Sequence, residues 1–323
     1  MPLPDKLPAY RDLPVVEVFG RSYRSAWGVF GAEDELGTWN TVTPERARAA
    51  AGLVRSGHRF ALDLPLDEPD PPLFHFRHAY RHVIEECSAG LNISYDDHLD
   101  GFFPQTSTQW DGLRHVCTPT HFYNGRPQSE VLAPGNTTIG VQKLVEHGLV
   151  TRGVLLDVEQ HLSAQGKTIS YDGAPFEISA DDLVQTARAQ GVEIRPGDVL
   201  LFRTGFLSWF RSAPRPVREA LAHNLQTPGL EPGAATAEYL WDLHIAAIAS
   251  DTVAIERWPV DPPRGFLHFQ LITFFGMTLG EMWWLDDLAR DCRADGRWDF
   301  MLVSVPLHVP GGVGSPANAI AIR

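Results

Sequence analysis

The sequence lacks several features that would assign it to a familiar class of protein. Its 323 residues include only three cysteines, Cys87, Cys117 and Cys292, which lie far apart and form no CxxC pair. Such usage is typical of a reducing compartment and implies no disulfide framework. The sequence has no run of about 18 apolar residues that could span a bilayer, and its N-terminus has no apolar signal core. We therefore expect a soluble, cytoplasmic protein.

Clustered positive charge is also absent. The net charge is −13, and no run of lysine and arginine interrupts the excess of acidic residues. Nucleic acid and anionic membrane surfaces are therefore not expected as partners, which leaves a small-molecule substrate. The sequence contains no GxSxG nucleophile elbow and no GxxxxGK[ST] phosphate loop, and no GxGxxG follows a predicted strand.

What the sequence does contain is a large core with alternating elements. It is 44% hydrophobic and 21% charged, as in ordinary globular proteins. Helices and apolar strands alternate in the second half, whereas the first half is rich in strands and loops, so the pattern predicts one α/β domain with a mixed sheet. Residues 1–26 are rich in proline and arginine and are expected to form an extended tail that wraps the surface or a partner subunit. The predicted helices are 43–57, 137–150, 179–192 and 232–244, and the predicted strands are 58–66, 152–158, 196–205, 245–256, 299–309 and 317–323.

One stretch, QTSTQWDGLRH, has the spacing of a metal site. Gln105, Gln109, Asp111 and His115 stand at offsets 0, 4, 6 and 10. Glutamine binds metals poorly, so the spacing and the residue types disagree. Asp111 and His115 would share a face on a helix, but the hydroxyl residues and the glycine favour a strand followed by a loop. The pattern alone is weak evidence for a catalytic site.

Two further groups could carry chemistry. His268 and Glu281 stand in apolar surroundings, where a charged side chain is costly unless it has a partner. A local cap or salt bridge would explain Glu281 equally well. His75, His78 and His82 lie at offsets 0, 3 and 7, which suggests either a metal site on a helix or a polar surface strand or loop.

Two weaker candidates complete the set. The acidic stretch SYDDHLD, residues 94–100, resembles a cation loop but lacks the glycine and the final glutamate of a calcium loop, so a solvated turn is expected. Cys117 lies two residues after His115 and could act as a nucleophile with it, although a small buried cysteine is the commoner role.

Five stretches resemble recurrent segments of the cyclase family, the metal-dependent hydrolases that include bacterial kynurenine formamidase and isatin hydrolase. They are AEDELGTWNTVTPE, RGVLLDV, GDVLLFRTGF, SDTVAIE and VPGGVGSPANAIAI, and they occur in the order that the family has. The resemblance implies a single cyclase-family domain over residues 27–323, with a mixed, partly barrel-like β-sheet core flanked by helices.

The resemblance also assigns roles. The family hallmark HxGTHxDxPxH places its aspartate on Asp111 and its last histidine, an acid/base catalyst, on His115. Its two leading histidines fall on Gln105 and Gln109, and the other matched positions are Ser107, Thr108 and Leu113. The distal ligands, a histidine and a glutamate, match His268 and Glu281.

The two glutamines change the expected metal chemistry. An amide offers a neutral oxygen and donates more weakly than imidazole. Asp111, His268 and Glu281 can still hold one divalent ion, Mn²⁺ or Zn²⁺ or else Mg²⁺, with Gln109 and Gln105 as further candidate ligands. A site for two metal ions is not expected.

The function implied is hydrolysis of a small amide, cyclic amide or lactone, in which His115 accepts a proton from water and delivers it to the leaving group. Cyclisation or dehydration of a biosynthetic intermediate by acid/base catalysis, with or without metal, is a second hypothesis, and a non-catalytic binding protein a third. Trp110, Phe103, Trp283 and Trp284 are candidates to line an aromatic pocket, with core packing as the alternative for each. A homodimer or homotetramer is expected.

Overall fold

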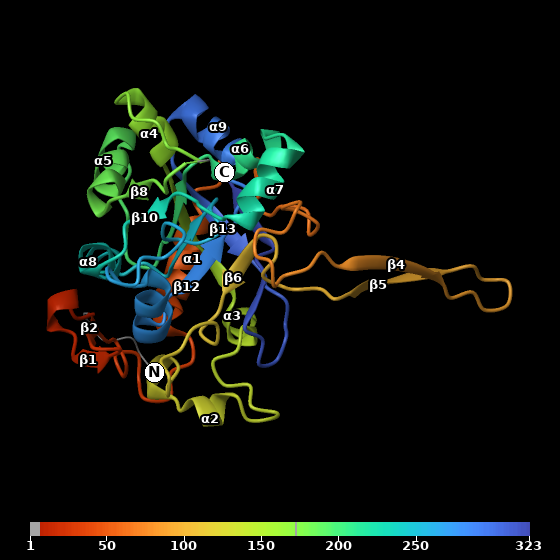
Figure 1. Ribbon diagram of the computed structural model, residues 1–323, viewed down its shortest axis with the longest axis horizontal. Coiled ribbons are helices and arrows are strands. Elements are labelled where there is room, and N and C mark those ends of the chain that lie inside the picture. The colour runs from red at the N-terminus through yellow and green to blue at the C-terminus, as the bar shows by residue number, and fades with distance from the viewer. Residues whose placement is uncertain (1–6, 172) are drawn as a thin grey trace.

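A nine-stranded mixed sheet forms the centre of the computed structural model, which describes residues 7–171 and 173–323 (Figure 1). The sheet is curled into a half-barrel. In spatial order its strands are β14 (Gly314–Pro316), β6 (Gln109–Asp111), β12 (Thr278–Glu281), β11 (Ala247–Ser250), β9 (Val199–Arg203), β7 (Leu149–Asp157), β13 (Asp299–Ser304), β15 (Ala319–Ile322) and β3 (Arg59–Ala61).

The middle of this sheet is parallel and its flanks are antiparallel. Strands β12, β11, β9 and β7 run parallel, whereas β6 and β13 pair antiparallel with their neighbours. Every residue of β9, β11 and β12 is buried. Parallel strands covered on both faces require such continuous apolar sequence, so the prediction of a single α/β domain with a mixed sheet is confirmed.

Helices cover the sheet, and two of them begin where the sequence predicted. Thr43 caps α1 by accepting a hydrogen bond from the Arg46 amide, and Ser179 forms a reciprocal capping box with Asp182 at α5. In the part of the chain that is described, no helix is long and apolar enough to cross a membrane. The helices are α1 (Pro44–Ala51), α2 (Gln128–Val131), α3 (Gln142–His147), α4 (Val158–Ala164), α5 (Ala180–Gln190), α6 (Phe206–Ser212), α7 (Arg215–His223), α8 (Ala234–Asp242), α9 (Asp286–Asp295) and a π-helix, η4 (Phe269–Phe275).

Two predicted helices are shorter than expected. The helix predicted over 43–57 ends at Ala51. The one predicted over 137–150 is reduced to α3, because Leu149 and Val150 belong to the buried strand β7 instead. The first helix ends at the C-cap Gly52, whereas strand pairing with β13 ends the second.

The N-terminal segment packs on its own chain. It forms a hairpin of β1 (Val15–Val18) and β2 (Arg21–Arg24), and the preceding residues contact α8. The Tyr10 amide donates to Asp242 at 2.6 Å, and the Trp241 indole donates to the Pro8 carbonyl at 2.9 Å. The first six residues of the predicted tail lie outside the described residues.

A two-stranded ribbon projects far from the body, as Figure 1 shows. It consists of β4 (Arg81–Glu86) and β5 (Tyr95–Asp100), paired antiparallel. Hence the predicted turn at 94–100 is a strand. The histidine cluster is not formed either, because His82 lies on β4 and contacts Asp97 at 2.6 Å, while the other two histidines precede the strand in a loop. We refer to residues 81–100 as the arm.

Candidate functional site

The pairing of β6 with β12 builds the first part of the site. Gln109 lies opposite Glu281, and Asp111 lies opposite Leu279 two residues further on. Residues directly opposite one another share a face of a sheet, and side chains alternate along each strand. Gln109, Asp111 and Glu281 therefore point to the same face, and all three are buried.

His268 reaches this cluster from the residue before η4. Its Nε2 lies 2.8 Å from Glu281 Oε1, and its Nδ1 lies 2.9 Å from Glu256 Oε1. Glu256 also accepts hydrogen bonds from the backbone amides of Leu267 and His268, both at 2.9 Å. The imidazole is thus held between two buried carboxylates. Sequence reasoning missed Glu256, although a glutamate directly after the apolar residues 253–255 of a predicted strand was a signal for it.

Asp111, His268 and Glu281 form a group that could hold a metal ion. One ligand atom from each lies within 4.8 Å of those of the other two. The resemblance predicted that these residues converge. Asp111 comes from β6, more than 150 positions before His268 at the start of η4 and Glu281 on β12.

The two glutamines act as hydrogen-bond donors to the carboxylates. Gln109 Nε2 donates to Glu281 Oε2 at 2.6 Å. Gln105 Nε2 donates to Asp111 Oδ1 and also lies 3.0 Å from His115 Nδ1. The opposite atom of one amide, Gln109 Oε1, is buried and has no hydrogen-bond partner among the described residues. A buried acceptor without a donor is costly. The unpartnered acceptor here is an amide oxygen that lies beside the acidic cluster.

The balance of charge in the cluster favours a cation. Burial lowers the pKa of His268, but the hydrogen bonds that its ring donates to Glu256 and Glu281, together with their negative charges, outweigh burial and raise that pKa well above its usual range. Burial and the charge of Asp111 raise the pKa of Glu281, while His268 opposes them. Three carboxylates therefore face one imidazolium, and a divalent ion would offset the excess negative charge. The residues fit a metal ion.

His115 stands at the edge of the cluster. Its Nε2 lies 3.8 Å from Asp111 Oδ2, beyond hydrogen-bond distance. Burial lowers the pKa of His115, and Arg77 and His268 act in the same direction while Asp111 opposes them. The imidazole is therefore neutral at pH 7, with one nitrogen bonded to the Gln105 amide and the other facing the carboxylates.

Comparisons with known proteins identify the family of this chain. The model of the family named Cyclase matches residues 56–257, more than half of the chain. A crystal structure described as a novel cyclase is 32% identical, with a TM-score of 0.81 over 93% of this chain and 99% of that one. The chain belongs to the cyclase family. No curated protein matches it.

More distantly similar structures share the fold. Isatin hydrolase A from Labrenzia aggregata, with benzyl benzoate bound, is 19% identical with a TM-score of 0.55, over 84% of this chain and 94% of the hydrolase. Isatin hydrolase A from Ralstonia solanacearum is also 19% identical, with a TM-score of 0.53 over 87% of this chain and 98% of that one. The cyclase fold is thus common to this chain and to these hydrolases.

Two aromatic residues predicted to line the pocket of this cyclase-family protein lie elsewhere. Trp110 stands between Gln109 and Asp111 on β6, so its indole points to the opposite face of the sheet. It is fully buried, packs edge-on against Trp283 and Trp39, and donates to Ser304. Both predicted indoles are core residues, which corrects that part of the pocket prediction.

The structure also shows where the other aromatic candidates and Cys117 lie. Phe103 is partly exposed in the loop that follows the arm, and its ring lies 5.9 Å from that of His78. Trp284 packs under the guanidinium of Arg211 and donates to Asp287. Cys117 accepts a hydrogen bond from Gln128 rather than from His115.

Arg77 is a cation beside the site that sequence reasoning missed. Its guanidinium lies over the rings of Phe74 and Phe76, at 4.8 and 5.4 Å from their centroids. It donates to the Gln105 carbonyl, and its charge lowers the pKa of both His115 and Glu281. A single arginine in the long loop between β3 and β4 gave no signal in the sequence.

The variant Arg77→Met is expected to raise the pKa of His115 in the metal-free protein, because it removes a positive charge that disfavours the imidazolium. NMR titration of the His115 ring would measure the change. Arg81→Met, in which an exposed arginine of the arm is replaced, is the matched control and should leave that pKa unchanged. An unaltered His115 titration in the Arg77 variant would contradict the placement of this charge beside the ring.

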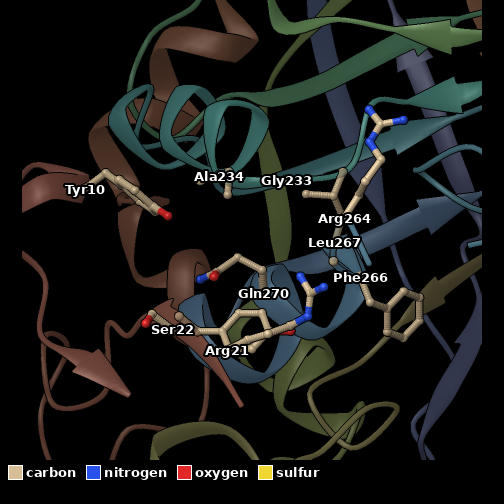
Figure 2. Close-up of a pocket in the computed structure, with 12 residues that line it drawn as sticks. Tyr10, Arg21, Ser22, Gly233, Ala234, Arg264, Phe266, Leu267 and Gln270 are labelled. Atoms are coloured by element: carbon tan, nitrogen blue, oxygen red, sulfur yellow. The ribbon is translucent and has the colours of Figure 1, made fainter. Parts of the chain in front are cut away.

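A separate cavity of about 160 Å³ lies behind His268, between β2, η4 and the start of α8. Figure 2 shows Tyr10, Arg21 and Gln270 around it, with the guanidinium of Arg264 turned away. Arg264 is engaged by Glu177 and Glu231. The adjacent ring of Phe266 stacks on His268 at 5.1 Å and supports it from this side.

Proposed function

We propose that this protein is a metal-dependent hydrolase of a small amide, cyclic amide or lactone. The observation that carries the proposal is the buried cluster of Asp111, His268 and Glu281, whose ligand atoms lie within 4.8 Å of one another and whose negative charge exceeds what one imidazolium offsets. Membership of the cyclase family and the fold shared with isatin hydrolases support it.

Asp111, His268 and Glu281 would hold one divalent ion, either Mn²⁺ or Zn²⁺, or else Mg²⁺ because the set is rich in oxygen. Such an ion polarises a carbonyl group and lowers the pKa of water. Gln109 can add its unpartnered Oε1 if its amide rotates. Gln105 is better suited to orienting Asp111 and His115 than to binding the ion, because both of its N–H groups are directed at them.

His115 moves the proton in this proposal. Gln105 donates to Nδ1 in the structure, so the neutral ring carries its hydrogen on Nε2. When the Gln105 amide turns away from Nδ1, the ring can take the tautomer with its hydrogen on Nδ1, and the lone pair of Nε2 then faces the cluster. In that tautomer Nε2 accepts a proton from water and passes it to the leaving nitrogen or alkoxide. The lowered pKa of His115 keeps the ring neutral and ready to accept it.

Metal removal tests the proposal. We expect about one Mn, Zn or Mg per chain in the purified protein by elemental mass spectrometry, since three protein ligands suffice for a catalytic site. Hydrolysis, screened across small amides, cyclic amides and lactones, should be lost on chelation and restored by adding the ion back. A protein that binds neither Mn²⁺ nor Zn²⁺ after soaking would refute a hydrolytic role for the cluster.

One observation favours a second function, acid/base cyclisation or dehydration without metal. The amides of Gln105 and Gln109 and the imidazole of His268 already satisfy the carboxylates of Asp111 and Glu281. A metal-free enzyme would keep its turnover in the presence of chelator, whereas the hydrolase would not. This comparison separates the two functions with a single preparation.

A further inference from the structure

Arg77 lies beside the candidate site and has no carboxylate partner of its own. The chain holds 40 acidic residues against 27 lysines and arginines, yet this guanidinium forms no ion pair among the described residues. Two acidic residues of the same loop pair with other arginines. Glu68 contacts Arg211 at 2.9 Å, and Asp70 contacts Arg215 at 3.2 Å. The loop between β3 and β4 therefore leaves a cation without an anion next to the site.

The guanidinium of Arg77 is held in one orientation. Its Nη1 donates to the Gln105 carbonyl, and the group lies 4.8 Å and 5.4 Å from the ring centroids of Phe74 and Phe76. These two rings stack on one another with 5.4 Å between their centroids. An arginine that is bonded at one nitrogen and packed on aromatic rings has already lost much of its rotamer freedom. A ligand that binds it therefore has less side-chain ordering to overcome.

A second edge of the same guanidinium is open. In the part of the chain that is described, Nε and Nη2 of Arg77 have no hydrogen-bond partner. The buried nitrogens without a partner include Nε of Arg114 and of Arg257 but neither nitrogen of this edge, so both are accessible. Nε and Nη2 carry two parallel N–H groups that match the two oxygens of a carboxylate. This edge is thus an unfilled site for a planar anion.

The open edge lies next to the candidate site. Gln105, whose carbonyl accepts from Arg77, places its side-chain amide against Asp111 and 3.0 Å from His115 Nδ1. The positive charge of Arg77 also lowers the pKa of both His115 and Glu281. One residue therefore links the guanidinium to the acid/base candidate and to a candidate ligand of the ion. A small molecule held at the open edge by one end has its other end at the cluster.

We propose that the substrate carries a carboxylate group, and that Arg77 is the specificity-determining residue that binds it side-on through Nε and Nη2. This inference rests on the proposed function. The amide or lactone carbonyl of the substrate lies at the ion held by Asp111, His268 and Glu281, and its carboxylate lies at Arg77. A carboxylate has the single charge that one guanidinium offsets, whereas a phosphate monoester would bring about two charges beside the buried carboxylates. The substrate class is a small acidic amide, cyclic amide or lactone.

Binding of a carboxylate to the metal-free protein tests this proposal without any turnover. The probe is benzoate, and benzamide is its neutral counterpart of nearly the same shape. After chelation of metal, a ligand-observed NMR titration should show benzoate binding at least about 10-fold more weakly to Arg77→Met than to wild type, because a charge-assisted bidentate contact is lost. Benzamide should bind the two proteins equally.

Two further variants make the titration decisive. Arg81→Met removes a nearby arginine that is already paired with Asp100, and it should bind benzoate as wild type does. Arg77→Lys keeps the charge but not the planar fork, and should also weaken benzoate binding, which preserves the test if Arg77→Met fails to fold by circular dichroism. Benzoate that binds the Arg77 variants as tightly as wild type, or that does not bind wild type, would overturn the proposal. Inorganic phosphate that competes better than benzoate would overturn the assignment to a carboxylate.

The hydrolysis screen tests the substrate class separately. Each acidic amide or lactone is paired with an analogue in which a methyl group replaces the carboxylate. Wild type should prefer the acid by at least about 10-fold in kcat/KM, and Arg77→Met should lose that preference. Turnover without preference for the acid would overturn the carboxylate proposal and leave the hydrolase in place. Absence of all turnover, beside benzoate binding that depends on Arg77, would refute the hydrolase and support the carboxylate site.

Discussion

Replacing Asp111 with asparagine is expected to remove bound metal and hydrolytic activity together. Asp111 is fully buried and is one of three ligand candidates, and the amide keeps its shape while losing its charge. We expect kcat/KM to fall by at least about 1,000-fold, which is the scale of losing metal-assisted stabilisation of the transition state. Elemental mass spectrometry and the hydrolysis assay, on the same preparation, measure both losses.

The same variant should remain folded. The charge of Asp111 raises the pKa of Glu281, so the two carboxylates repel one another when no cation lies between them. Asp111→Asn relieves that repulsion, and the thermal midpoint of the metal-free protein should not decrease. Metal should raise the midpoint of wild type, by about 2.7 kcal/mol in stability at 100 times Kd, and should not raise that of the variant.

Glu33→Gln is the control, because it removes one carboxylate from the exposed surface. It should keep both the metal and the activity. An Asp111→Asn variant that retains stoichiometric metal would show that the ion binds elsewhere. If the variant loses activity although neither it nor wild type binds metal, the result would favour acid/base catalysis over metal-dependent hydrolysis.

Much of the fold was predictable because local signals and tertiary structure agree. Apolar runs at 196–205 and 245–256 became the buried strands β9 and β11, and Thr43 and Ser179 cap helices as their residue types favour. The ends of helices were harder to predict. Leu149 and Val150 fit a helix, but they pair with β13 inside the central sheet. Such pairing is decided by residues 150 positions away.

The candidate site was likewise predictable where local signals sufficed and not where distant parts of the chain meet. The spacing of Asp111 and His115 was visible in one stretch, but their convergence with His268 and Glu281 came only from the resemblance to a family. The positions of Trp110 and Gln109 could have been separated by sequence, since neighbours on a strand face opposite ways. The position of Arg77 could not have been predicted from the sequence, because its place beside His115 depends on how the irregular loop before the arm folds.

The largest effect on stability is expected at Arg203, away from the metal cluster. This buried guanidinium ends β9 and contacts Asp157 at 2.9 Å, Asp286 at 2.7 Å and Glu159 at 3.1 Å. Burial lowers the pKa of Arg203, but these carboxylates outweigh it and raise the pKa above its usual range. Arg203→Met fills similar volume and leaves the buried carboxylate of Asp286 without its cation, while Asp157 keeps its ion pair with Arg293, so we expect the free energy of unfolding to fall by about 3–5 kcal/mol.

The loss in Arg203→Met should depend on pH. Burial raises the pKa of Asp251 to about 6, and Arg203 opposes that rise, so the variant should raise this pKa further. A carboxyl group whose folded pKa exceeds its unfolded value binds protons on folding, and its cost in stability shrinks as pH falls through the folded pKa. The difference from wild type in urea denaturation should therefore be larger at pH 8 than at pH 5.5. Arg215→Met, which removes an exposed arginine paired with Asp70 and Glu219, should cost less than about 1 kcal/mol at either pH. Equal losses in the two variants would show that the buried network does not hold the ends of β7 and β9 together.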